Sequence, residues 1–343
     1  MSFPRLAHPI VLAPLSGGAS TPELAAAVSG AGGLGFIAAG YTTADALATA
    51  IAHTRHLTTA PIGVNVFVLE EGTVDERALD AYRERLAPDA ARLGATPGEP
   101  RFDDDDLGAK VDVLEQARVA VVSTAFSCPS AELVARLHAA GSEVWVTIGA
   151  PGEVNAAIST GADALVVQGT EAGGHRGGLD ERSELSLIPL LRLVRRETDV
   201  PLVAAGGIGD GASVAAMLAA GAVAAQIGTA FLRAPEAGTS AAHRAALAER
   251  APTAITRAFT GRRARGIVND FMRAHPDAPA AYPQIHHVTA PLRAAARAAG
   301  DQESINLWAG EAYPLAEELP AAEIVRRFAA DARDALTAAQ SRI

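Results

Sequence analysis

Residues 164–177 read Ala-Leu-Val-Val-Gln-Gly-Thr-Glu-Ala-Gly-Gly-His-Arg-Gly, an apolar run followed at once by a glycine-rich loop that carries a histidine. The apolar run is continuous rather than alternating, which is typical of a parallel strand covered on both faces. The loop therefore lies past the carboxyl end of that strand, where α/β sheets and barrels gather ligands and catalytic groups. Glycines there let the backbone approach a flat or anionic ligand closely. The stretch predicts a parallel α/β fold with a ligand site around His175.

Seven further apolar runs have this character, and each is followed by a segment that can form a helix. Helix starts are indicated at Thr21-Pro22, Ser130 and Asp210, because these residue types cap helix N-termini or open the first turn. Eight strand–helix units favour a (β/α)8 TIM barrel over an open sheet. The predicted strands are residues 10–14, 33–38, 62–67, 119–124, 143–148, 164–169, 201–207 and 224–231.

Two segments exceed the minimal repeat. Residues 70–117 are long and polar, with a helix expected over 76–93 and an acidic run at 103–106. We interpret the acidic run as a solvated helix start before Leu107 rather than as a cation site. After the eighth strand, residues 235–290 are richer in Arg, Pro and His, which indicates a small inserted lid domain. The predicted domains are a barrel over residues 1–234 and 291–343 and a lid over residues 235–290.

Composition excludes several classes of function. The chain has 343 residues, 49% of them hydrophobic, a length that suits one α/β barrel with an insertion. Its net charge of −10 argues against nucleic acid as a partner. Apolar runs are strand-sized, short of the ~20 residues of a membrane helix, and no secretory leader is recognisable. The single cysteine, Cys128, fits a reducing compartment. We expect a cytoplasmic monomer or homodimer with neither nucleic acid nor membrane as partner.

Glycine turns end the last two predicted strands. One is Gly206-Gly207, and the other follows Gln226-Ile227 as Gly228-Thr229. In barrels the loops after strands seven and eight form a common phosphate site, where free backbone N–H groups and a helix N-terminus face the anion. A relaxed dinucleotide fingerprint that starts at Gly207 is rejected, because it follows the seventh strand rather than the first.

Three polar residues stand in or just past predicted strands: Asn65 lies within 62–67, Gln168 near the end of 164–169, and His175 in the loop that follows. His175 is the candidate catalytic residue, since a base needs a pKa near neutrality and access to a substrate C–H bond. Asn65 and Gln168 either satisfy neighbouring loops or hydrogen-bond a heterocyclic ring in the barrel mouth. The nine histidines include no His-Glu-x-x-His pattern and no Cys/His cluster, so no metal is expected. We interpret Cys128 as a buried thiol rather than a nucleophile.

Motifs spread over nearly the whole chain carry a family resemblance. They are residues 13–18, 21–25, 32–35, 63–65, 168–177, 204–208, 226–232, 260–266 and 304–310. Together they resemble those of the nitronate monooxygenases, formerly called 2-nitropropane dioxygenases, a family of FMN-dependent barrel enzymes. The segment 82–110 is also similar to the bacterial class I branch.

The resemblance implies a site for flavin mononucleotide (FMN) and a place for the substrate. His175 falls on the family's active-site histidine. The substrate pocket would include Tyr282 and His286, although this chain has His286 and Ala290 where class I has a tyrosine and a lysine. The implied FMN contacts are Pro14, Asn65, Gln168 and Gly173, with the phosphate on Gly206, Gly207, Gln226, Ile227, Gly228 and Thr229.

The implied activity is that of a flavoprotein monooxygenase, in which alkyl nitronates such as propionate 3-nitronate react with O2 to give carbonyl compounds and nitrite. His175 would either hold the nitronate when protonated or remove the α-proton of a nitroalkane when neutral, and both roles stay open. One alternative is an FMN-dependent NAD(P)H:quinone or enoyl-thioester reductase, because related barrels share the Glu-Ala-Gly-Gly-His loop. Others are a non-catalytic FMN-binding protein and a phosphate-handling barrel without flavin.

Overall fold

The structure is a computed structural model and describes residues 4–249 and 251–342, so the outermost predicted domain limits, residues 1 and 343, lie outside it. Its central feature is an eight-stranded parallel sheet in the order β1-β9-β8-β6-β5-β4-β3-β2. All eight predicted strands are confirmed, and the (β/α)8 barrel with them. The strands are β1 (Ile10–Leu12), β2 (Gly35–Ala38), β3 (Ile62–Phe67), β4 (Val121–Ala125), β5 (Glu143–Ile148), β6 (Ala164–Gln168), β8 (Leu202–Ala205) and β9 (Ala224–Ile227).

The sheet closes into a barrel where β1 meets the segment that leads into β2. A bridge joins Val11 to Leu34, and Leu12 N donates to the Leu34 carbonyl oxygen at 2.9 Å. Inside the barrel, the rings of Phe36 and Trp145 lie 5.9 Å apart and are both fully buried. Residues adjacent to these along each strand face the surrounding helices instead. Each strand is therefore apolar on both faces, which is why the runs are continuous in the sequence.

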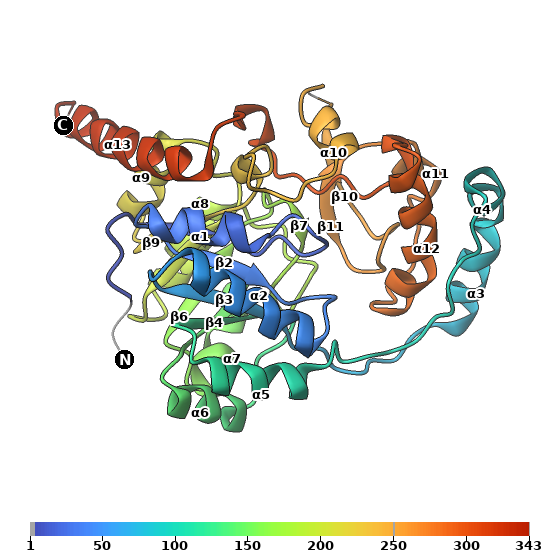
Figure 1. Ribbon diagram of the computed structural model, residues 1–343, viewed down its shortest axis with the longest axis horizontal. Coiled ribbons are helices and arrows are strands. Elements are labelled where there is room, and N and C mark those ends of the chain that lie inside the picture. The colour runs from blue at the N-terminus through green and yellow to red at the C-terminus, as the bar shows by residue number, and fades with distance from the viewer. Residues whose placement is uncertain (1–3, 250, 343) are drawn as a thin grey trace.

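Helices surround the barrel between its strands (Figure 1). Thr21, Ser130 and Asp210 cap their helices through their side chains, as predicted, and Asp210 forms a capping box with Ser213. None of the helices in residues 4–249 and 251–342 is both long and apolar enough to cross a membrane. The barrel helices are α1 (Pro22–Gly30), α2 (Ala44–Leu57), α5 (Leu107–Ala117), α6 (Ala131–Ala140), α7 (Val154–Ser159), α8 (Leu187–Arg195), α9 (Gly211–Ala219) and α13 (Ala321–Gln340).

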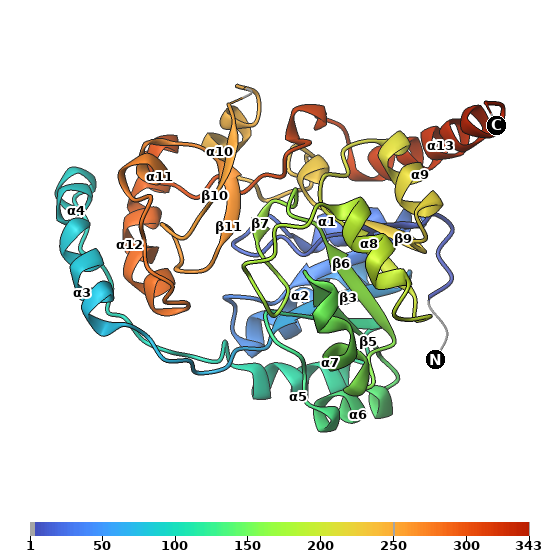
Figure 2. The same cartoon turned by 180° about the vertical axis from the view of Figure 1, so that it is seen from behind.

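A second lobe stands beside the carboxyl ends of the strands (Figures 1 and 2). Two segments far apart in the chain build it around one apolar cluster, which includes Leu79, Tyr82, Phe259, Phe271 and Ile285. The helix expected over 76–93 is two helices that meet at Leu86. The lobe contains α3 (Glu76–Arg85), α4 (Ala87–Leu93), β10 (Thr253–Thr256), β11 (Ala264–Ile267), α11 (Asp270–Ala274) and α12 (Gln284–Ala298), with α10 (Ala241–Ala246) nearby.

The boundary at residue 290 of the predicted lid, residues 235–290, falls within a helix of this lobe. Helix α12 continues past residue 290, and its buried Val288 and Leu292 belong to one cluster with α3. A two-residue strand, β7 (Gly174–His175), leaves the barrel and pairs with β11, so the three-stranded sheet β10-β11-β7 joins the two lobes.

The interpretation of the acidic run, residues 103–106, as a solvated helix start is wrong for one residue. Helix α5 begins at Leu107 as predicted, but Asp105 is not solvated. Its Oδ2 lies 2.7 Å from Nζ of Lys110, whose side chain is fully buried, and its Oδ1 accepts the Tyr41 N–H at 2.8 Å. Asp104 and Asp106 are exposed, as a solvated helix start predicts. The correction therefore concerns Asp105 alone, which pairs with Lys110 and fixes the backbone of Tyr41.

Candidate active site

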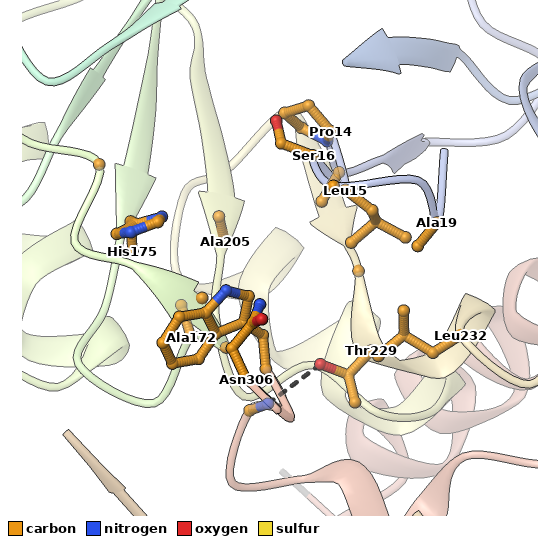
Figure 3. A pocket seen from close by; sticks show the side chains of 18 of the residues that line it. Pro14, Leu15, Ser16, Ala19, Ala172, His175, Ala205, Thr229, Leu232 and Asn306 are labelled. Carbon is orange, nitrogen blue, oxygen red and sulfur yellow. Dashed lines mark hydrogen bonds between the residues drawn. The ribbon is translucent and has the colours of Figure 1, made fainter. Parts of the chain in front are cut away.

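A cavity of about 410 Å³ opens at the carboxyl ends of the barrel strands, against the second lobe. Figure 3 shows His175 at one side of this cavity and Thr229 at the other. Tyr282 is not among the lining residues, but its ring lies 5.6 Å from the ring of His175. The predicted site residues that line the cavity are Pro14, Asn65, Gln168, Gly173, His175, Gly206, Gly207, Gln226, Ile227, Gly228, Thr229 and His286.

His175 lies in β7, which pairs with β11. Its Nε2 lies 2.9 Å from the Thr260 hydroxyl oxygen, and the rings of Phe126 and Trp308 lie 5.7 and 5.6 Å away. Burial above all, together with the positive charges of Arg262 and Arg293, lowers the pKa of His175 to about 3. The imidazole is therefore neutral at physiological pH, with access to the cavity.

The two predicted amide side chains, Gln168 and Asn65, form different contacts. Gln168 is fully engaged with the histidine loop: its Oε1 accepts the Gly177 N–H at 2.8 Å, and its Nε2 donates to the His175 carbonyl at 3.2 Å. Asn65 Nδ2 donates to both the carbonyl and the hydroxyl oxygen of Ser123 in β4. Gln168 therefore positions the loop that carries His175.

The glycine turns form a cradle of free donors. Gly206 and Gly207 have φ values of 111° and 67°, the left-handed region that glycine tolerates. In the described part of the chain, the N–H groups of Gly207, Gly228 and Thr229 donate to no protein acceptor. Helix α9 and the short 3-10 helix η2 (Thr229–Phe231) begin directly after the two turns. This arrangement suits a phosphate.

Several buried polar atoms of the cavity wall have no hydrogen-bond partner within the residues described. Buried polar groups are nearly always satisfied, so a polar ligand is expected to complete them. These atoms are Gln226 Oε1, Thr239 Oγ1, His243 Nε2 and Asn306 Oδ1.

Sequence reasoning missed an aromatic wall next to His175. Tyr41 follows β2 and Phe126 follows β4. Their φ values are 66° and 82°, in the left-handed region that residues other than glycine rarely adopt. The ring of His286 stacks on Tyr41 at 4.1 Å, and the Tyr41 and Tyr282 hydroxyl oxygens lie 3.0 Å apart. The only signal in the sequence was the place of both residues just after apolar runs.

Two arginines near the site were also missed. Arg262 lies over the ring of Phe126, 4.5 Å from its centre, and donates to the Arg176 and Gly178 carbonyls. Arg293, on α12, lines the cavity and is buried. Arg262 lies in the motif 260–266, but the sequence predicted no role for either arginine, because an arginine in a polar stretch is ordinarily at the surface.

Metal and thiol chemistry find no support at this site. Among the described residues, no group of three His, Cys, Asp or Glu side chains is arranged to hold a metal ion. Burial raises the pKa of the Cys128 thiol, and Glu153 and Glu70 raise it further, which disfavours the thiolate.

Comparisons with known proteins cover almost the whole chain. The model of the family described as nitronate monooxygenase matches residues 4–331. The nitronate monooxygenase of Pseudomonas aeruginosa is 40% identical over 340 residues, which are 95% of this chain and 96% of that protein. That of Paraburkholderia phytofirmans is 40% identical over 333 residues, 93% of this chain and 91% of its own.

Solved structures agree with this assignment. Nitroalkane oxidase from Streptomyces ansochromogenes is 48% identical, with a TM-score of 0.94 over 97% of this chain and 98% of that one. FabK from Thermotoga maritima is 27% identical, with a TM-score of 0.79 over 98% and 96% of the two chains. Sequence, fold and the histidine loop at the barrel mouth lead to one conclusion: the chain belongs to the nitronate monooxygenase family.

Proposed function

We propose that this enzyme binds FMN in the cavity and uses O2 to oxidise alkyl nitronates, such as propionate 3-nitronate, to carbonyl compounds and nitrite. The observation that carries the proposal is a neutral histidine and a cradle of free N–H groups at two ends of one cavity. The family and the similarity to a nitroalkane oxidase support the substrate class.

The cavity wall fits a flavin. Gly206, Gly207, Gln226, Ile227, Gly228 and Thr229 would hold the phosphate, and Pro14, Asn65, Gln168 and Gly173 would contact the rest of the cofactor. The unsatisfied polar atoms of the wall are what a ligand with many hydrogen-bonding groups would complete. A flavin bound there would supply the one-electron redox chemistry that links nitronate oxidation to O2.

A pKa of about 3 keeps His175 neutral, which disfavours the cationic role, and it also makes the ring a weaker base than the near-neutral pKa expected from the sequence. The Thr260 hydroxyl can donate to the Arg262 carbonyl oxygen, 3.3 Å away. His175 Nε2 then carries the proton and donates to Thr260, which leaves Nδ1 free to accept a proton. In this arrangement the neutral ring removes the α-proton of a nitroalkane and orients the resulting nitronate. Of the two roles left open by the sequence, we propose the neutral one.

The test combines a spectrum with product analysis. The purified protein is expected to show flavin absorbance, to release nitrite aerobically from propionate 3-nitronate, and to be bleached by the nitronate without O2. His175→Asn is expected to keep its flavin and to lose about 10²-fold or more in kcat/KM with nitroethane, the typical effect of removing a general base. A colourless protein that cannot take up FMN contradicts the proposal. Rapid bleaching by NADH alone, without nitrite release from any nitronate, indicates the reductase instead.

A further inference from the structure

Arg293 is a buried cation in the wall of the cavity. Helix α12 presents its guanidinium inward, and the residue is only 8% exposed. Nε donates to the Thr289 hydroxyl at 3.1 Å, and Nη2 donates to the His286 carbonyl at 3.0 Å and lies 3.2 Å from His286 Nδ1. Neutral groups thus fix its orientation, and Nη1 has no hydrogen-bond partner in the described part of the chain.

No protein carboxylate compensates this charge. Within residues 4–249 and 251–342, Arg293 forms no ion pair with an acid. Arg297, one turn further along α12, is also on the cavity wall but is exposed. The charge of Arg297 and the hydroxyls of Tyr41, Tyr82 and Tyr282 act on Arg293. Arg293 in turn lowers the pKa values of His175, His286 and His287. Burial lowers the pKa of Arg293 to about 10, so it still carries its proton at neutral pH. An unpaired buried charge is costly, which indicates that a ligand supplies the anion.

The cavity as a whole is electropositive in an acidic protein. The chain carries a net charge of −10, yet its cavity lining contains two arginines and neither Asp nor Glu. His175 and His286 add no charge, because burial lowers their pKa values to about 3 and about 2. Ala290, one turn before Arg293, also lines the cavity, and its short side chain leaves the guanidinium accessible.

We propose that Arg293 binds the anionic oxygen atoms of the substrate and makes the enzyme prefer charged substrates to their neutral forms. A guanidinium matches the planar, two-oxygen geometry shared by a nitronate and a carboxylate. The identity of the substrate rests on the proposed function. That an anion binds at Arg293 rests on the position of this residue on α12. His286 and Thr289 are positioning residues that hold the guanidinium toward the cavity.

The kinetic test compares the charged and neutral forms of one carbon skeleton. Arg293→Met is expected to raise KM for ethyl nitronate or propionate 3-nitronate about 10- to 100-fold, the effect of losing a charge-assisted hydrogen bond, while KM for neutral nitroethane changes less than about threefold. Arg293→Lys is expected to restore part of the loss. An increase for both nitronates assigns the nitronate oxygens as the bound group, and an increase for propionate 3-nitronate alone assigns the carboxylate. Equal changes for charged and neutral substrates, or none, overturn the proposal.

A second measurement does not need turnover. Inorganic nitrate, a planar anion, is titrated into the flavin-loaded protein while the flavin absorbance is followed. Nitrate is expected to bind the unaltered protein about tenfold or more tightly than Arg293→Met. Equal affinities contradict the inference even if nitrite production is normal, whereas a clear difference supports it even if the protein oxidises no nitronate.

The matched control is Arg333→Met, which removes a positive charge from an exposed position on α13, outside the cavity wall. It is expected to leave both nitrate affinity and KM unchanged. Flavin content and thermal unfolding are measured for every variant. If Arg293→Met does not fold, Arg293→Gln and Arg293→Lys are compared in its place, and the nitrate affinity of the glutamine variant decides.

Discussion

His175 owes its charge state to its neighbours rather than to its own chemistry. A threonine hydroxyl and three aromatic rings surround it and bury it. This burial disfavours an imidazolium most, and the charges of two nearby guanidinium groups add to the effect. The shift runs from an ordinary value of 6.5 down to about 3. The folded protein therefore binds this proton less readily than the unfolded chain does, and His175 makes folding less favourable as the pH falls below 6.5 toward 3.

This charge state can be measured directly. In protein labelled with 15N-histidine, the His175 imidazole signals are expected to stay at the neutral position from pH 8 to pH 5. Free histidine added to the sample, titrating near pH 6.5, provides the internal reference. The spectrum of His175→Asn identifies the signals. Titration of His175 near pH 6.5 contradicts the neutral assignment and restores the cationic role.

At this scale the sequence predicted residues that lie beside recognisable backbone features. His175 and Gly206 were found because glycines surround them, and Asn65 because it interrupts an apolar run. Arg293 could not be found, because its burial depends on contacts with segments far away in the sequence. Tyr41 was missed for the same reason: its left-handed backbone is held by Asp105, which the chain reaches only 64 residues later.

In the proposed function, the turn between β8 and α9 would hold part of the FMN phosphate. An alanine at position 207 would have to adopt a left-handed backbone conformation. Its methyl group would lie 3.0 Å from Glu171 Cβ. Alanine in that conformation costs about 1–2 kcal/mol, and any relaxation moves the free N–H groups of the turn.

Gly207→Ala is therefore expected to lower the free energy of unfolding by about 1–2 kcal/mol and to weaken FMN binding. Urea unfolding and quenching of FMN fluorescence measure the two effects. The control is Gly72→Ala, at an exposed position with nothing within 4 Å of the added methyl group. Loss of stability with unchanged FMN affinity would mean that this turn does not bind the phosphate.

The barrel strands were predictable because burial on both faces removes polar residues from them. The predicted eighth strand, 224–231, is shorter in the structure: it ends at Ile227 and continues as the 3-10 helix η2. Strand β7 was not predicted. It has two residues, and its pairing partner β11 lies about 90 residues further along the chain, so no local pattern marks it.

At the scale of the molecule, the second lobe is held together by one shared apolar cluster. Within it, the Tyr82 hydroxyl donates to the buried Ala258 carbonyl at 2.6 Å, linking α3 to the segment that precedes β11. Burial raises the pKa of Tyr82 well above its ordinary value, so this hydroxyl keeps its proton and remains a donor.

Tyr82→Phe is expected to destabilise the protein by about 1–3 kcal/mol, because a buried carbonyl loses its donor while the ring remains. Proteolysis is expected to become faster in residues 70–100, where α3 and α4 lie. Urea unfolding and mass mapping of the cleavage sites check this. Unchanged stability and an unchanged cleavage pattern would show that the bond contributes nothing to docking of the lobe.

The sequence predicted only one of the two segments that build this lobe. Residues 235–290 differ in composition from the barrel, which indicated a separate unit. Helix α3 gave no such sign, because its apolar positions Leu79 and Tyr82 fit any amphipathic helix. Which surface an amphipathic helix covers is decided by the fold as a whole and not by the helix.

The order in which this lobe is made follows from its two-part origin. Helices α3 and α4 leave the ribosome early, whereas the apolar residues they cover, from Ala254 to Leu292, are translated some 160 residues later. At ~5–20 residues per second, their hydrophobic side waits roughly 8–32 seconds without its partner. Such distant contacts also raise the contact order and slow folding. The nascent chain thus has a built-in delay during which chaperones have a defined surface to protect.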